Sequence, residues 1–320
     1  MNRCGFLATA VIFFIGLGVW EGGAQSLWAE QAPAANGVPA HAVVTVEPHK
    51  GTQIPVVTKD DVLVYEGHDR DTVLDWVPAT GDHAALEFFV LIDDESNSTL
   101  GTQLNDIKKF ILGQPETTKV GVAYMQNGTA RIEQNLTSDH AQAVKAIRLP
   151  LAYRGANASP YFSISDLIKR WPGSTARREV LMVSDGIDPF YPSPDFQDPY
   201  LDAAIEDAQR AGIVVSAIYT PAVGHFGHSF WRTYWGQLYM SELAEKTGGE
   251  AYYIGFMGPP VAFSPYLENL TNRLGNQYLL TFLAKPPKKA GLQPIRIRSE
   301  LNTVDLVGPG QVYVSPAPKE

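Results

Sequence analysis

Thiols and basic residues are both scarce in this chain. It has a single cysteine, Cys4, among 320 residues, so it can form no internal disulfide and no thiolate metal cluster, and its stability must come from burial of apolar side chains. Lys and Arg number 25 against 34 Asp and Glu, which gives a formal net charge of −9. Nucleic-acid binding needs a basic surface, so the composition argues against a nucleic-acid partner.

Catalytic signatures are missing as well. The sequence has no G-x-S-x-G, no H-E-x-x-H and no P-loop, and its seven histidines are scattered. His225 and His228 have the i, i+3 spacing of some metal ligands, but no third ligand is near them in sequence, so a structural role is favoured. We therefore expect that the protein is not an enzyme. Hydrophobic residues make up 45% of the chain, which is long enough for one large or two modest domains.

Residues 1–24 have the pattern of a secretory signal peptide. Arg3 precedes an apolar run, GFLATAVIFFIGLGVW, and small residues end the segment at Ala24. The apolar run is shorter than the ~20 residues of a bilayer-spanning helix, so an uncleaved anchor is the less favoured alternative. We expect an exported protein, periplasmic or secreted, that loses Cys4 on cleavage and has no membrane span afterwards. The small, Pro- and Ala-rich segment 25–40 is expected to be a flexible lead-in.

The middle of the chain predicts an α/β domain over residues 84–275. Apolar, strand-like runs, including 86–92 and 180–184, alternate with helical patterns. This alternation predicts a doubly wound, mostly parallel sheet with helices on both faces. Residues 129–136 directly follow Asn127-Gly128 and are expected to return as the antiparallel edge strand of a hairpin.

Two β segments flank this domain, at residues 41–82 and 277–315. Both alternate apolar and polar residues and are interrupted by Gly and Pro. Neither segment buries a hydrophobic face alone. We therefore expect them to pair as one small flanking β module.

Acidic and hydroxyl residues follow two of the predicted strands. Asp94, Ser96 and Ser98 form a D-x-S-x-S string after the first buried strand, and Asp185 precedes a glycine after a later one. The carboxyl ends of parallel strands meet at the edge of the sheet where ligands bind. Hard oxygen ligands in that position can converge on one divalent cation.

These residues resemble the metal-ion-dependent adhesion site of the von Willebrand factor A family. That family has D-x-S-x-S after its first strand, a Thr-Pro on a middle loop and an Asp-Gly after a later strand. Asp94, Ser96, Ser98 and Asp185 match this pattern residue by residue. Ser159, which precedes a proline, stands at the middle position and keeps the hydroxyl without the methyl group.

The resemblance extends over about residues 42–315. The segments VTVEPHKGTQIPVVTKDDVLVYEG and NQYLLTF look like a bacterial group of exported von Willebrand A-related proteins, many from acidobacteria. The chain departs from that group at LVGPGQVYV, where Arg-Pro-Gly-Tyr is usual, and at Asp61-Val62, where Asp-Phe is usual. The resemblance implies Mg²⁺ or Mn²⁺ held by the hydroxyls, with the aspartates acting directly or through water. A partner protein's Glu or Asp carboxylate would complete the shell, and the implied function is metal-ion-dependent protein binding, or adhesion.

Plainer interpretations of the same residues remain open. The D-x-S-x-S string can be an Asx turn or helix cap, or a site that keeps the fold and has lost its ion. The acidic loop 188–198 can bind a second cation or be solvated. A metal-assisted hydrolase rests only on the open coordination position.

An aromatic cluster offers an ion-independent alternative. It falls in an expected insertion between a strand and a helix, and it can form a partner-binding surface or pack on its own domain. In this interpretation, the protein is a structural or assembly module of the cell envelope that binds without an ion. The residues of the cluster are Phe226, Phe230, Trp231, Tyr234 and Trp235.

Overall fold

A computed structural model describes the chain over residues 37–51, 54–152, 159–188, 198–221, 230–253 and 262–317. The chain from Asn36 onward forms one compact unit. The expected signal peptide and most of the expected lead-in lie outside the described residues. Residues 38–40 of that lead-in already belong to the first strand. No helix in the described ranges is both long and apolar enough to cross a bilayer.

The central part of the chain is an α/β fold. Its elements in chain order are β4 (Leu86–Asp93), η3 (Ser98–Gly101), α1 (Leu104–Leu112), β5 (Thr118–Gln126), β6 (Thr129–Thr137), α2 (His140–Lys145), α3 (Pro160–Arg170), β7 (Arg177–Ser184), α4 (Pro199–Ala211), β8 (Ile213–Tyr219), α5 (Phe230–Thr247), β9 (Ala251–Tyr252) and α6 (Ser264–Gly275). The strands form one six-stranded sheet in the order β6-β5-β4-β7-β8-β9. All neighbouring pairs are parallel except β5 with β6, so the sheet is mixed rather than uniformly parallel.

The antiparallel edge of this sheet follows from the Asn127-Gly128 turn. Both residues have positive φ, 50° and 69°, as a tight hairpin turn requires. β6 pairs with β5 from Gln126 opposite Thr129 onward. The predicted hairpin and its edge position are confirmed.

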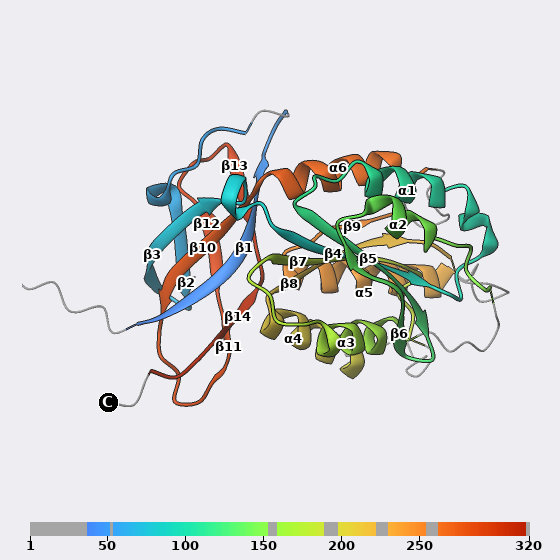
Figure 1. Cartoon of the computed structure of the whole chain (residues 1–320). Coiled ribbons are helices and arrows are strands. Elements are labelled where there is room, and N and C mark those ends of the chain that lie inside the picture. The colour runs from blue at the N-terminus through green and yellow to red at the C-terminus, as the bar shows by residue number, and fades with distance from the viewer. Residues whose placement is uncertain are drawn as a thin grey trace, which may run out of the picture. The chain divides into compact units, whose positions relative to one another are not determined.

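Helices cover both faces of the sheet (Figure 1). Successive residues of β4 alternate between the two faces because the side-chain period of a strand is two. Phe88 and Val90 pack in a core with residues of α1, α2 and α6. Phe89 and Leu91 pack in a second core with residues of α3, α4 and α5. Burial on both sides explains the continuous apolar run of this strand.

The flanking segments form a larger β structure than the small module expected. Its elements are β1 (Val38–Pro48), η1 (Lys59–Asp61), β2 (Val62–Glu66), β3 (Asp69–Pro78), η2 (Gly81–His83), β10 (Gln277–Ala284), β11 (Gly291–Pro294), β12 (Arg296–Ser299), β13 (Val304–Val307) and β14 (Gln311–Val314). Six strands pair in the order β12-β2-β3-β10-β1-β13, and β11 pairs with β14. Strands of the N-terminal and C-terminal β segments thus share the six-stranded sheet. Their core contains Val44, Val64 and Phe282.

A buried polar network joins the two parts where α6 leads into β10. The Arg177 side chain, at the start of β7, donates to the carbonyl of Leu274 and to the side chain of Gln277. Gln277 in turn donates to Glu179 at 2.6 Å. Burial raises the pKa of Glu179 to about 7, with the charge of Arg177 opposing the shift.

Candidate functional site

Two carboxylates meet at the carboxyl ends of β4 and β7. Asp93 is the last residue of β4, and Asp185 follows directly after β7. The two strands are parallel neighbours, with Ile92 opposite Val183, so both acids lie at the same sheet edge. Ser184 Oγ donates to Asp93 Oδ2 at 2.8 Å, which ties the two strand ends together.

The surroundings raise the pKa of both carboxylates. Burial and then the charge of Asp185 raise the pKa of Asp93 well above its usual range. Removal from water raises the pKa of Asp185 to about 6, although the Ile187 N–H bonded to its carboxylate and the charge of Arg232 act in the opposite direction. Like charges held together in a poorly solvated site favour a bound proton or a bound cation.

Asp94, the acid that the sequence predicts as an ion ligand, is paired with Arg148. Its carboxylate is fully buried and accepts two hydrogen bonds from the Arg148 guanidinium, at 2.6 and 2.8 Å. Gln126 and the Leu151 N–H also donate to it. These hydrogen bonds outweigh burial and lower the pKa of Asp94. The structure thus places Asp93 beside Asp185 and pairs Asp94 with Arg148.

The displacement by one residue has a simple cause. Neighbouring strand residues point to opposite faces of the sheet, and Asp93 is the one that shares a face with Ser184, from whose Oγ it accepts a hydrogen bond. Arg148 competes for the other one, and its guanidinium also lies 3.7 Å from the centre of the Tyr124 ring. The double acid Asp93-Asp94 was visible in the sequence, but the long-range partner that selects between them was not.

The two serines of the string differ in their surroundings. Ser96 is buried, its N–H donates to the Asp93 carbonyl, and its Oγ has no hydrogen-bond partner within the described part of the chain. Ser98 is exposed and begins η3. The helix cap is Asn97, whose side chain accepts from the Thr99 N–H, so neither serine is used for capping. A buried, unpaired hydroxyl in the turn after Asp93 fits an oxygen ligand.

Ser159 directly precedes α3 and contacts the loop that follows β7. It is the N-cap of α3, where its Oγ accepts from the Phe162 N–H and donates to Asp188 Oδ2 at 2.5 Å. Asp188 is almost fully buried and stands three residues after Asp185. The Tyr161 hydroxyl donates to the Gly186 carbonyl and fastens the same loop to α3. The structure thus links Ser159 to the Asp185 loop through Asp188, which the sequence pattern places in a separate acidic loop.

The rest of that acidic loop is only partly visible. Residues 189–197 lie outside the described residues. Asp198 is the N-cap of α4 and accepts from the N–H groups of Tyr200 and Leu201. Its described contacts are therefore those of a helix cap.

Two glycines bring α5 against the Asp185 loop. Gly186 has a φ of +72°, and a Cβ atom there would lie 2.4 Å from the Gly236 carbonyl oxygen. A Cβ on Gly236 would lie 1.9 Å from the Asp185 carbonyl oxygen. Only glycine fits this approach. The Asp185-Gly186 pair in the sequence indicates the need for glycine at position 186, but no pattern in the sequence indicates the need for glycine at position 236.

Four of the five aromatic residues of the cluster, Phe230, Trp231, Tyr234 and Trp235, lie in the first turns of α5. Phe230 and Trp231 are exposed by 47% and 66%, with their rings 5.6 Å apart in a T-shaped pair. Tyr234 is exposed on the next turn, whereas Trp235 packs against the core beside Tyr239. Phe226, His225 and His228 lie outside the described residues.

The donor set fits a hard divalent cation in type. Asp93, Asp185 and the Ser96 hydroxyl are oxygen donors, the kind Mg²⁺ and Mn²⁺ prefer. Within the described ranges, no group of three or more His, Cys, Asp or Glu side chains is arranged to hold a metal. Any ion here would accordingly depend on two carboxylates supplemented by hydroxyls, water or a partner.

No family model matches the sequence, and no curated protein matches it. Solved structures that align with the chain include an aerotolerance-related membrane protein from Bacteroides fragilis NCTC 9343, at 16% identity and a TM-score of 0.43, over 59% of this chain and 98% of that one. The SpRpn10 VWA domain aligns at 15% identity and a TM-score of 0.38, over 58% and 95%. The ArnB paralog VWA2 from Sulfolobus acidocaldarius aligns at 10% identity and a TM-score of 0.38, over 89% and 73%. At these identities and TM-scores, the likenesses do not decide what this chain binds.

Proposed function

We propose that the chain is an exported protein-binding module that uses Mg²⁺ or Mn²⁺ at the sheet edge to hold a partner. The observation that carries the proposal is the pair of perturbed carboxylates, Asp93 and Asp185, at the ends of adjacent parallel strands. Ser96 and Asp185, which match the von Willebrand A adhesion motif, support it. The proposed role is binding and not catalysis.

In this proposal Asp93, Asp185 and the Ser96 hydroxyl hold the ion. Ser159 acts one step away, because it anchors Asp188 and through it the Asp185 loop. A bound cation supplies a positive charge that a partner's Glu or Asp carboxylate can complete, and such charge-assisted contacts strengthen where water is excluded. The exposed Phe230 and Trp231 on α5 supply apolar surface near this edge.

The test is selection of binders from a displayed peptide library in Mg²⁺, with elution by EDTA. We expect EDTA-sensitive binders that share an acidic residue, and loss of their binding both on Asp185→Asn and when that acid is changed to its amide. Asp202→Asn, on exposed α4 surface, is the matched control and should bind as the wild type does. Binders that ignore EDTA and Asp185→Asn would contradict the proposal.

The ion-independent alternative makes the opposite prediction. If the protein is an assembly module that binds through α5, binding should survive EDTA and should fall on Trp231→Ser. The exposed T-shaped pair of Phe230 and Trp231 is the observation that keeps this alternative open.

A further inference from the structure

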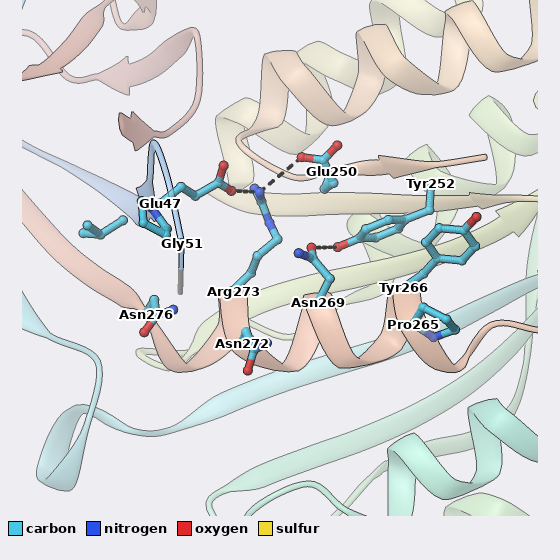
Figure 2. Close-up of a pocket in the computed structure, with 12 residues that line it drawn as sticks. Glu47, Gly51, Glu250, Tyr252, Pro265, Tyr266, Asn269, Asn272, Arg273 and Asn276 are labelled. Atoms are coloured by element: carbon cyan, nitrogen blue, oxygen red, sulfur yellow. Dashed lines mark hydrogen bonds and ion pairs between the residues drawn. The ribbon is translucent and has the colours of Figure 1, made fainter. Parts of the chain in front are cut away.

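A polar pocket lies at the opposite end of the strands from Asp93 and Asp185. It has a volume of about 610 Å³ and is lined by the end of β1, the residues around β9 and one side of α6 (Figure 2). Glu250, which directly precedes β9, marks its position at the amino-terminal strand ends. The volume lies within the range of sites that hold small ligands, roughly 300–1,000 Å³.

Charges of alternating sign form one wall of this pocket. The Arg273 side chain is 7% exposed and lies between the carboxylates of Glu47 and Glu250, the latter 3.2 Å from its Nη1 (Figure 2). Its guanidinium also donates to the carbonyls of Gly248 and Gly249. Arg273 repels a ligand cation, and the two glutamates repel a ligand anion. Because Arg273 is already paired with both glutamates, these charges are largely engaged with one another, and we infer that the wall offers hydrogen-bonding groups to a neutral ligand.

One face of α6 provides the other contacts. Tyr266, Asn269, Arg273 and Asn276 follow one another at spacings of three or four residues, which places them on one side of the helix. The Tyr252 hydroxyl donates to Asn269 Oδ1 at 2.9 Å and fixes the orientation of that amide (Figure 2). The rings of Tyr252 and Tyr266 lie 5.4 Å apart and form an aromatic wall beside the amides.

We propose that this pocket binds a neutral saccharide. Sugar hydroxyls both donate and accept hydrogen bonds, as do amides, while carboxylates accept and guanidinium groups donate. The apolar C–H face of a sugar ring packs against an aromatic ring, and Tyr266 is partly exposed to the pocket. Aromatic packing combined with amide, carboxylate and guanidinium groups matches this ligand class in each respect. The site is separate from the sheet-edge ion site and does not depend on it.

The test is a glycan array of neutral bacterial, plant and animal oligosaccharides, probed with the purified full chain in EDTA. Hits are then titrated by calorimetry against the wild type, Tyr266→Ala and Asn269→Ala. We expect at least one hit whose affinity falls tenfold or more in both variants. The exposed Tyr313→Ala and Asn302→Ala, which lie outside the pocket, are matched controls and should bind within twofold of the wild type.

Glu250→Gln separates a neutral ligand from a charged one. A saccharide should keep its affinity within about threefold, because the amide still accepts a hydrogen bond. Argininamide, titrated in parallel, should not bind. The proposal is overturned by an array without hits, by hits that ignore Tyr266→Ala and Asn269→Ala, or by argininamide binding that is lost in Glu250→Gln. Because EDTA is present throughout, these results do not depend on the ion site.

Discussion

Asp93 and Asp94 are sequence neighbours whose replacement should affect the stability of the protein differently. Asp94 is fully buried and forms a bidentate ion pair with Arg148. Removing one partner of a buried ion pair costs about 3–5 kcal/mol, because the remaining charge loses its compensation. Arg148 is about one-third exposed, so its charge regains some hydration. We therefore expect Asp94→Asn to lower the free energy of unfolding by about 2–4 kcal/mol.

Asp93→Asn should behave differently in the absence of a divalent ion. It removes one of two like charges and keeps an oxygen that can accept from Ser184 Oγ. Burial and then the charge of Asp185 raise the pKa of Asp93 well above its usual range, so charging Asp93 in the folded protein is unfavourable and the neutral amide removes that cost. We expect the free energy of unfolding in EDTA to be unchanged or to rise by up to about 2 kcal/mol.

Urea unfolding in EDTA at pH 7.5, followed by tryptophan fluorescence, compares the two variants with the wild type. The reasoning is refuted if Asp94→Asn is as stable as the wild type. It is equally refuted if Asp93→Asn loses more stability than Asp94→Asn. Either result would mean that the two carboxylates are assigned to the wrong surroundings.

Three other perturbations follow from single features of the fold. The pKa of Glu179 is about 7 in the folded protein, above its ordinary value of 4.5. The contribution of Glu179 to the free energy of unfolding is therefore fully present below about pH 4.5 and is lost as the pH rises through 7. Glu179→Gln should abolish up to about 3 kcal/mol of this loss, as measured by urea titrations from pH 4.5 to 8. Gly186→Ala should destabilise the protein by about 1–3 kcal/mol or more, because Gly186 has a positive φ and a Cβ there would meet the Gly236 carbonyl. Gly173→Ala, where a Cβ meets nothing within 4 Å, should change the free energy of unfolding by less than about 0.5 kcal/mol. Equal melting temperatures of the two variants would contradict the close approach of α5 to the Asp185 loop. Trp231→Ser, at a 66% exposed position, should change the free energy of unfolding by less than about 0.5 kcal/mol, and a larger loss in urea would show that this ring supports the fold.

The fold was predictable where local patterns are strong. The Asn127-Gly128 turn fixed the antiparallel edge strand, and continuous apolar runs marked the strands covered by helices on both faces. The start of α5 was missed because its aromatic first turns resemble an exposed loop in composition. The extent of the β structure was underestimated because its last four strands are only four residues each, too short to give a clear alternation.

The sequence predicts where the candidate site lies but not which side chains form it. Strand ends of a parallel sheet meet at one edge, so acids after β4 and β7 were expected to be close. The choice between Asp93 and Asp94 depends on Arg148, which lies 54 residues beyond Asp94. Likewise, the bond between Ser159 and Asp188 joins positions 29 residues apart. Such long-range selection leaves no local pattern in a single sequence.

Mn²⁺ binding, measured by electron paramagnetic resonance of the free ion, tests the central claim most directly. The account predicts saturable binding of one ion to the wild type, competition by Mg²⁺, and loss of binding in Asp93→Asn and Asp185→Asn. Asp94→Asn, compared at a temperature where it remains folded, should retain the site. Binding that survives both Asp93→Asn and Asp185→Asn, or no binding by the wild type, would contradict a metal centre at this sheet edge.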